Sequence, residues 1–74
     1  MNNSRPTQCD YIMMYLTEYG TITTYEAFTE LGITRLGARI SEMRRKGINI
    51  IGASETRKNR FGKKVSFMRY RLGE

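Results

Sequence analysis

The stretch from Thr23 to Gly47 constrains the fold most, because it predicts two short helices separated by a very short turn. The first helix is expected over residues 23–31. Glu26 follows Thr23 by three residues, a pattern in which a carboxylate and a hydroxyl each satisfy an unpaired N–H at a helix start. Gly32 supplies the left-handed conformation in which helices often end. The apolar residues of this helix at helical spacing are Ala27, Phe28 and Leu31.

The second helix of the stretch is expected over residues 34–46, with Thr34 as its cap and Gly47 at its end. Two helices joined by a short turn that contains a glycine are the signature of a helix-turn-helix motif. Gly37 is small, so the backbone there can approach another surface closely. That surface is either a bound ligand or the preceding helix. The inward residues at i, i+4 and i+7 are Leu36, Ile40 and Met43.

A further helix is expected before this motif, over residues 7–19, with Thr7 as its cap and Gly20 as its stop. Residues 1–6 are polar and lack periodicity, which predicts a disordered tail outside a single domain of residues 7–74. The residues expected on the buried face of the helix are Cys9, Ile12, Met13, Leu16 and Tyr19.

The opposite face of this first helix is unusually apolar for a surface that meets solvent, because Tyr11, Met14 and Tyr15 lie there beside Glu18. Two interpretations are open. The side chains pack against the C-terminal strands, which is the preferred expectation for so small a domain. Alternatively, they form the contact between two copies of the chain in a homodimer.

After Gly47 the apolar period changes to two, which indicates β-strands. Strands are expected near residues 48–56 and 64–72 as an antiparallel hairpin, and residues 21–22 fit a very short additional strand. The connection holds five cations in eight residues around Phe61, with no acid. Such a cluster favours phosphate contacts, because binding releases counterions. These cations are Arg57, Lys58, Arg60, Lys63 and Lys64.

Charge is divided sharply along the chain, whose formal net charge is +6. Residues 1–34 hold one arginine against four acids, whereas residues 35–71 hold twelve Lys and Arg against two Glu. A basic surface that serves only for solubility normally has acids interspersed among its cations. The segregation therefore favours a surface that contacts a polyanion.

Composition excludes several classes of protein. The chain has 74 residues, one Cys and no His, so neither an intramolecular disulfide nor a Cys/His metal site is expected. No nucleophile–base pair or phosphate-cradling glycine loop points to an enzyme, and no cofactor is expected. The apolar runs are too short to span a bilayer, and the N-terminus lacks a signal peptide pattern, which predicts an intracellular protein.

The order of three helices and a basic hairpin, together with the segments GTITTYEAFTELGITRLGARISEMRRKGINI and KNRFGKKVSFMRYRL, resembles the small winged helix-turn-helix proteins of phage and prophage genomes. The resemblance implies an α+β winged fold and binding to double-stranded DNA in the cytoplasm of a bacterial host. It also implies that the third helix lies in the major groove and that the wing follows the backbone or an adjacent minor groove. The chain departs from the family pattern at Gly37, where Ser or Ala is usual, and at Met43, where Leu is usual.

The residues themselves suggest how such a protein reads DNA. Arg35 and Arg39 are the first candidates for base contacts, because arginine pairs bidentately with guanine. Ser41, Glu42 and Arg45 are the next candidates, although the spacing of Glu42 also favours an ion pair within the helix. The candidates for backbone contacts are the N–H groups of Thr23 and Thr24, the five hairpin cations and Arg44.

Two rival functions start from the same surface. A small phage protein with a basic hairpin can instead bind an acidic surface of a host protein. RNA is the other rival, although its usual modules stack bases on sheet aromatics, and only Phe61 and Phe67 are placed for that here.

Overall fold

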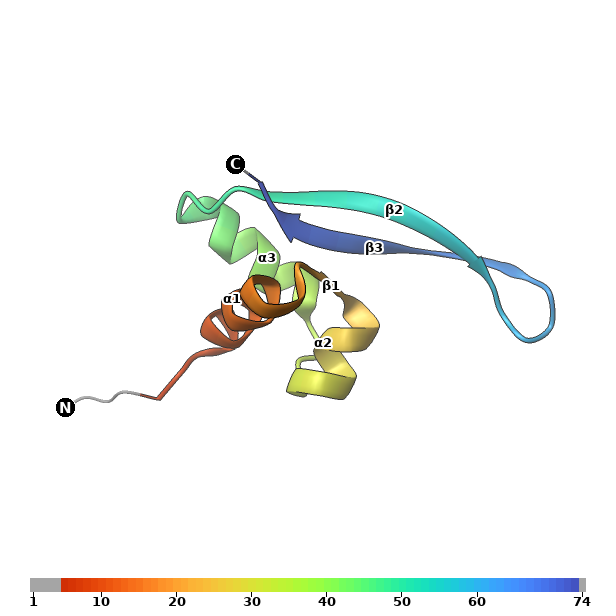
Figure 1. Ribbon diagram of the computed structural model, residues 1–74, viewed down its shortest axis with the longest axis horizontal. Helices are drawn as coiled ribbons and strands as arrows, with labels where there is room; N and C mark the ends of the chain where they lie inside the picture. Colours follow the sequence, from red (N-terminus) through yellow and green to blue (C-terminus); the bar gives the residue numbers. More distant parts are fainter. Residues whose placement is uncertain (1–4, 74) are drawn as a thin grey trace.

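Three helices and a three-stranded antiparallel sheet make up residues 5–73, which are the residues that the computed structural model describes (Figure 1). The expected α+β winged arrangement is therefore confirmed. The proposed tail falls mainly on residues 1–4, which lie outside the described residues, while Arg5 and Pro6 are irregular and exposed. In chain order the elements are α1 (Gln8–Tyr19), β1 (Thr21–Thr23), α2 (Thr24–Leu31), α3 (Leu36–Arg45), β2 (Ile50–Lys58) and β3 (Lys64–Leu72).

The first two helices begin at the capping residues that the sequence predicts. The Thr7 hydroxyl accepts from the N–H of Asp10 at 3.2 Å, and the Asp10 carboxylate accepts from the Thr7 N–H at 2.8 Å. Thr23 and Glu26 repeat this reciprocal pair at the start of α2, with distances of 3.2 and 3.0 Å. Each cap contributes about 1 kcal/mol of helix stability, so both boundaries are set locally.

The start of α3 differs from the prediction, because Arg35 rather than Thr34 occupies the N-cap position. Gly32 adopts a left-handed conformation, with φ of 69°, and the Ile33 N–H returns to the Ala27 carbonyl oxygen. This turn buries the Ile33 side chain in the core and leaves Thr34 exposed. The helix consequently begins at Leu36, and no side chain caps it.

The sheet has the order β1-β3-β2, so the last strand in sequence is the central one. Along β3, residues 69–71 pair with β1, while all of residues 64–72 pair with β2. Strand β2 begins at Ile50, two residues later than expected, because the Ile48 N–H still bonds back to the Met43 carbonyl oxygen of α3. The short strand expected at residues 21–22 is confirmed as β1.

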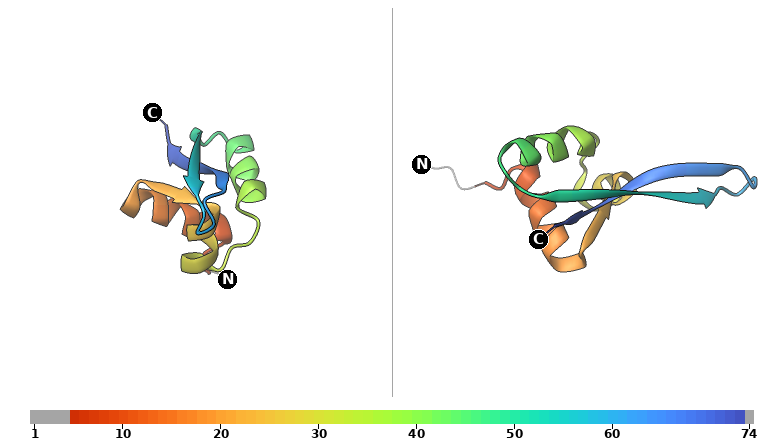
Figure 2. Two further views of the ribbon diagram at one scale, coloured as in Figure 1. Left: turned by 90° about the vertical axis from the view of Figure 1, so that its right-hand side faces the viewer. Right: turned by 90° about the horizontal axis from the view of Figure 1, so that it is seen from above.

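The hairpin of β2 and β3, which we call the wing, extends well beyond the rest of the fold (Figures 1 and 2). Seen end-on, α3 lies on one side of the wing and α1 on the other (Figure 2). From the Ser54–Met68 pair outward no third strand accompanies the two strands among the described residues. The extents of the molecule, 51 × 26 × 21 Å, reflect this projection.

The core is formed where the three helices meet β1 and the first residue of β2. Its buried members are Ile12, Leu16, Ile22, Ala27, Ile33, Leu36, Ile40, Met43 and Ile50. The inward assignment of Leu36, Ile40 and Met43 is confirmed. Tyr19, expected on the buried face of the first helix, is instead 62% exposed. Phe28, one of the apolar residues at helical spacing in the second, is 58% exposed. Tyr19 is the last residue of α1, and α2 has only eight residues, so Ala27 and Leu31 already fill its inward side.

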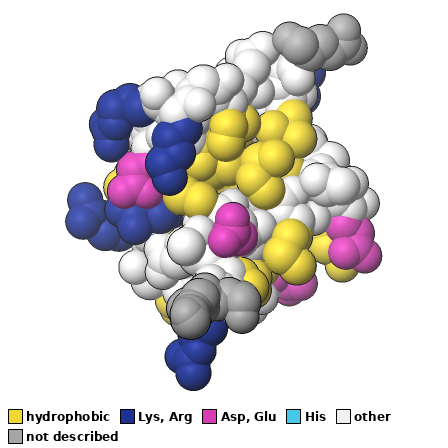
Figure 3. All heavy atoms as spheres, turned by 90° about the vertical axis from the view of Figure 1, so that its left-hand side faces the viewer, with side chains coloured by type: hydrophobic (Ala, Val, Ile, Leu, Met, Phe, Trp, Pro, Cys, Tyr) yellow, Lys and Arg dark blue, Asp and Glu magenta, His cyan; other side chains and the backbone are white. Residues whose placement is uncertain are grey.

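The apolar face of α1 does not lie under the C-terminal strands as expected, since Tyr11 and Met14 remain exposed. Of the side chains Tyr11, Met14 and Tyr15, only Tyr15 packs against the core, and the centroid of its ring lies 4.6 Å from that of the Tyr19 ring. Burial raises the pKa of the Tyr15 hydroxyl. The exposed side chains instead line a shallow groove of about 240 Å³ with Glu30 and Leu31 of α2. Hydrophobic side chains also gather at the end of the molecule opposite the wing, with Lys and Arg on one side (Figure 3).

Candidate nucleic-acid interface

The outward face of α3 is the first part of the candidate interface. Since Leu36, Ile40 and Met43 hold the opposite face in the core, this face is directed to solvent. Its exposed members, including the N-cap residue, are Arg35, Gly37, Ser41 and Arg45. Three of the five residues expected to contact bases are therefore exposed together on or beside one helix.

Gly37 lies in open space, because a Cβ added there would meet nothing within 4 Å. Close packing against α2, one of the two explanations that the sequence left open, is thereby excluded. The other explanation, that the small residue lets the outward face of α3 approach a ligand closely, stays a prediction.

Arg39 and Glu42 lie on the flank of α3 that faces α1. Arg39 Nη2 is 3.3 Å from Glu42 Oε2, so the ion pair expected within the helix is confirmed. The Cys9 thiol of α1 donates to the other Glu42 oxygen at 3.6 Å. Burial, followed by this hydrogen bond, raises the pKa of Cys9, which favours the protonated thiol. Arg39 and Glu42 are consequently engaged with each other, and both are only partly exposed.

Arg44 connects α3 to the sheet. Its Nε and Nη2 both donate to the Ile50 carbonyl oxygen, at 3.1 and 2.9 Å. The guanidinium also lies 5.8 Å from the centroid of the Tyr70 ring, in a cation–π arrangement. Arg44, expected to contact the DNA backbone, is exposed, but two of its donors are engaged with the sheet.

The wing tip is the second part of the candidate interface, and all five of its predicted cations are exposed. The turn is held by Asn59, whose Oδ1 accepts from the N–H groups of Phe61 and Lys63 at 2.9 and 3.0 Å. Lys58 and Lys64 face each other directly across the two strands. Two like charges in this position destabilise a strand pair. The pair therefore concentrates positive charge at the wing tip without contributing to the stability of the hairpin.

The start of α2 offers less to a phosphate than expected. Thr23 is buried, and both its N–H and its hydroxyl are occupied by the capping pair with Glu26. Thr24 is exposed at the first helical position. Of the two threonines, only Thr24 keeps its place at the surface.

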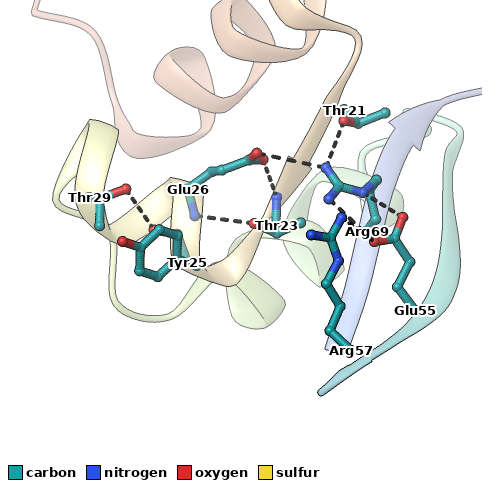
Figure 4. Close-up of polar contacts among 8 residues, drawn as sticks. All are labelled: Thr21, Thr23, Tyr25, Glu26, Thr29, Glu55, Arg57 and Arg69. Carbon is teal, nitrogen blue, oxygen red and sulfur yellow. Dashed lines mark hydrogen bonds and ion pairs between the residues drawn. The ribbon is translucent and has the colours of Figure 1, made fainter. Parts of the chain in front are cut away.

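Arg69 of β3 is the main structural residue that the sequence analysis missed (Figure 4). Its Nε and Nη2 donate to the two oxygens of Glu55 at 2.7 and 3.3 Å. Its Nη1 donates to the Thr21 hydroxyl at 3.2 Å and lies 3.7 Å from a Glu26 oxygen. One guanidinium therefore joins the wing, β1 and the capped start of α2.

The hydrogen bond from Arg69 lowers the pKa of the Glu55 carboxyl, and the same bond raises the pKa of Arg69. A signal for this network was present in the sequence, because Glu55 is one of only two acids among residues 35–71. Choosing its partner required the register that places Ala53 opposite Arg69 and Glu55 opposite Phe67.

A second groove, of about 400 Å³, lies between the start of α2 and the base of the wing. Its lining residues are Thr23, Tyr25, Glu26, Arg57, Phe67 and Arg69. Within it, Arg57 is only loosely paired, with Nη2 4.0 Å from Glu55 Oε1. Arg57 is thus the wing cation nearest to the body of the fold.

The helices α2 and α3 with the short turn between them, together with the protruding basic hairpin, define a winged helix-turn-helix domain. A family model described as a winged helix-turn-helix domain matches residues 7–74, and the chain belongs to this family. Such domains are typically DNA-binding modules rather than enzymes, so membership indicates DNA as the partner. Searches of the curated proteins and of the solved structures found no match.

Two further findings concern residues 5–73 alone. No helix in this range is long and apolar enough to cross a membrane. The same range contains no group of three His, Cys, Asp or Glu side chains that could hold a metal ion.

Proposed function

We propose that this protein binds double-stranded DNA sequence-specifically, with α3 in the major groove and the wing along the backbone. The observation that carries the proposal is the state of the two acids in residues 35–71. Glu42 is paired with Arg39, and Glu55 with Arg69. Apart from the loose Arg57–Glu55 contact, the exposed cations of the outward face of α3 and of the wing tip have no ion pair with an acid among the described residues, which favours binding to a polyanion.

Within this proposal, base contacts are assigned first to Arg35, Ser41 and Arg45, which are exposed. Arginine at such positions pairs bidentately with guanine. A base contact from Arg39 or Glu42 would require their ion pair to open, so these two residues take second place.

Backbone contacts are assigned to the wing cations and to the N–H groups at Thr24. Positive charge rather than exact geometry decides such contacts, which suits the tip of a projecting hairpin. Arg44 takes this role only if it releases the Ile50 carbonyl. The wing cations concerned are Arg57, Lys58, Arg60, Lys63 and Lys64.

The biological role we propose is that of a transcriptional regulator or DNA-architectural factor of a phage or prophage, acting in the bacterial cytoplasm. Its support is the resemblance of the helix pair and the wing to small proteins of phage genomes. The alternative is a module that binds an acidic surface of a host protein through the same cations. DNA is preferred because membership of the winged helix-turn-helix family indicates it.

The decisive experiment selects a preferred duplex from random DNA and then measures binding isotherms on that duplex and on an unrelated one at several salt concentrations. Arg35→Ala should cost about 1–3 kcal/mol on the preferred duplex and much less on the other. Arg35→Lys should fail similarly, because lysine keeps the charge but lacks the planar fork.

The matched wing variants, Lys58→Ala and Lys63→Ala, should weaken binding to both duplexes alike. Each should also reduce the slope of log K against log salt by about 1, because one phosphate contact is lost. If the wild type binds no duplex more tightly than roughly 10⁻⁴ M at physiological salt, the DNA proposal fails and the protein-binding alternative replaces it. Equal losses for Arg35→Ala on both duplexes would mean that α3 does not read sequence.

We also propose that two copies associate through the apolar face of α1, where Tyr11 and Met14 are exposed beside Tyr15. A dimer of this kind would read two half-sites on DNA. Sedimentation at several concentrations tests it: Met14→Glu should reduce association, whereas Thr17→Glu, on an exposed polar position of the same helix, serves as the control. A wild type that stays monomeric at every concentration excludes the dimer.

A further inference from the structure

Phe61 stands at the wing tip with 86% of its surface exposed, the largest value among the exposed large hydrophobic residues of the described chain. Because so little of the side chain is covered, the ring contributes almost nothing to the packing of the described residues. Its neighbours along the turn are the cations Arg60 and Lys63, beyond which lie Lys58 and Lys64. A large apolar side chain surrounded by positive charge is suited to a ligand that is both anionic and able to receive a ring.

The turn that carries Phe61 is closely bonded. Asn59 Oδ1 accepts from the backbone N–H groups of Phe61 and Lys63, and the Asn59 N–H donates to the Lys63 carbonyl oxygen at 2.8 Å. Gly62 completes the turn with φ of 82°, and its N–H donates to the Asn59 carbonyl oxygen. The backbone therefore fixes the direction in which the ring leaves the chain, so little backbone order is lost on insertion.

The wing also gives the ring reach. Strand pairs from Ser54–Met68 to Lys58–Lys64 continue beyond β1, a stretch of five residues in each strand. At about 3.3 Å per residue this ribbon projects roughly 16 Å from the body before the turn begins. The tip can consequently contact DNA away from the place where α3 lies (Figures 1 and 2).

Groove dimensions decide what the tip can insert. The minor groove of B-DNA is about 6 Å wide and about 7.5 Å deep, which is too narrow for a two-stranded ribbon but sufficient for single side chains. The opposed Lys58 and Lys64 would then face the phosphates that border the groove, and this would relieve the repulsion between them.

We propose that Phe61 inserts from the minor groove between two stacked base pairs, so that the wing bends the DNA as well as holding its backbone. The inference rests on the proposed DNA binding and adds a source of specificity to it. Wedging a side chain costs unstacking energy, and pyrimidine–purine steps such as TA and CA/TG unstack most easily. The wing therefore selects a flexible step at a fixed distance from the bases that α3 reads.

The test uses the selected duplex with 2-aminopurine placed at successive steps of the region next to the α3 site, and a second copy with a dye at each end. Wild-type protein should raise 2-aminopurine fluorescence at one step and shorten the distance between the dyes. Phe61→Ala should lose both signals and bind about tenfold or more weakly, as the loss of an aromatic–base contact does. Its salt slope should stay unchanged, unlike that of Lys63→Ala.

Two matched variants control the experiment. Val65→Ala truncates another exposed apolar residue of the wing away from the turn and should retain both signals. Phe61→Leu should retain part of the bend, because leucine also acts as a wedge. A wild type that binds tightly without bending or unstacking DNA overturns this inference and leaves the proposed function intact. A wild type that binds no duplex overturns the proposed function itself.

Discussion

Helix α3 and the wing both present cations to solvent, but the fold supports them in opposite ways. Leu36, Ile40 and Met43 of α3 are almost completely buried, which fixes the orientation of the outward face. In the two strands of the wing only Ile50 is buried, and it lies at the end next to the body. Side chains on α3 are thus presented with defined geometry, whereas those of the wing are presented mainly as charge. The difference explains why discrimination between sequences is assigned to α3 and salt-dependent affinity to the wing.

The contrast first predicts that the buried side of α3 contributes much more to the free energy of unfolding than the wing does. Leu36→Ala or Ile40→Ala should lower the free energy of unfolding by about 2–5 kcal/mol, because a buried aliphatic side chain is truncated. Val65→Ala in the wing should change it by no more than about 0.5 kcal/mol. Urea titrations of the three variants measure both values. Comparable losses at Val65 and Leu36 would show that the wing is as strongly packed as the helix.

A substitution at Gly37 tests the outward face of α3 directly, because it is expected to change the stability of the protein and its affinity for DNA in opposite directions. Gly37→Ala should stabilise the free protein by up to about 1 kcal/mol, since alanine is the better helix former and its Cβ has open space. Binding to the preferred duplex should nevertheless weaken, because the added methyl group keeps α3 from the groove. Thermal unfolding and binding isotherms report the two effects. Tighter binding would show that α3 does not approach DNA closely at this point.

The smallest effect concerns the base of the wing, where Arg69 holds Glu55. Because this hydrogen bond lowers the folded-state pKa of Glu55, its stabilising contribution is complete above the ordinary carboxyl pKa of about 4.3. The contribution is lost as pH falls from there through the lower folded-state pKa. Arg69→Met should therefore give a shallower fall of stability with acid than the wild type.

Arg71→Met is the matched control for this measurement. Arg71 is exposed on the same strand and has no ion pair with another described residue. Urea midpoints measured between about pH 3 and pH 6 compare the variants. If Arg71→Met flattens the pH dependence as much as Arg69→Met does, general charge rather than the Glu55 contact is responsible.

Local signals predicted most of the helix boundaries correctly. The capping pairs at Thr7 and Thr23 and the left-handed Gly32 depend on residues three or four positions apart, so the sequence alone determines them. The predicted start of α3 at Thr34 was wrong, because burial of the Ile33 side chain outweighed the capping preference of Thr34. Such competition between a local preference and the core cannot be read from spacing.

The contacts of the candidate site likewise divide into those that local sequence predicts and those that depend on the tertiary structure. Exposure of Arg35, Ser41 and Arg45 follows from helical periodicity once the core face is known, and the Arg39–Glu42 pair follows from their spacing. The contacts of Arg44 and Arg69 could not be predicted, because they depend on where β2 and β3 lie relative to α3 and α2. Residues joined by tertiary contacts become recognisable only after the sheet register is known.

The order of the sheet has a consequence for how the protein is made. Strand β3, which is synthesised after the other two strands of this sheet, lies between β1 and β2. A chain synthesised only as far as Lys58 already contains both outer strands, but they have no neighbour with which to pair. Helices α1 and α2, with their local caps, can form before β3 is made, whereas the sheet, the Arg69 contacts and the wing all require β3. The wing therefore forms only once β3 has been made, whereas the buried core residues that hold the inner side of α3 all precede β3 in the chain.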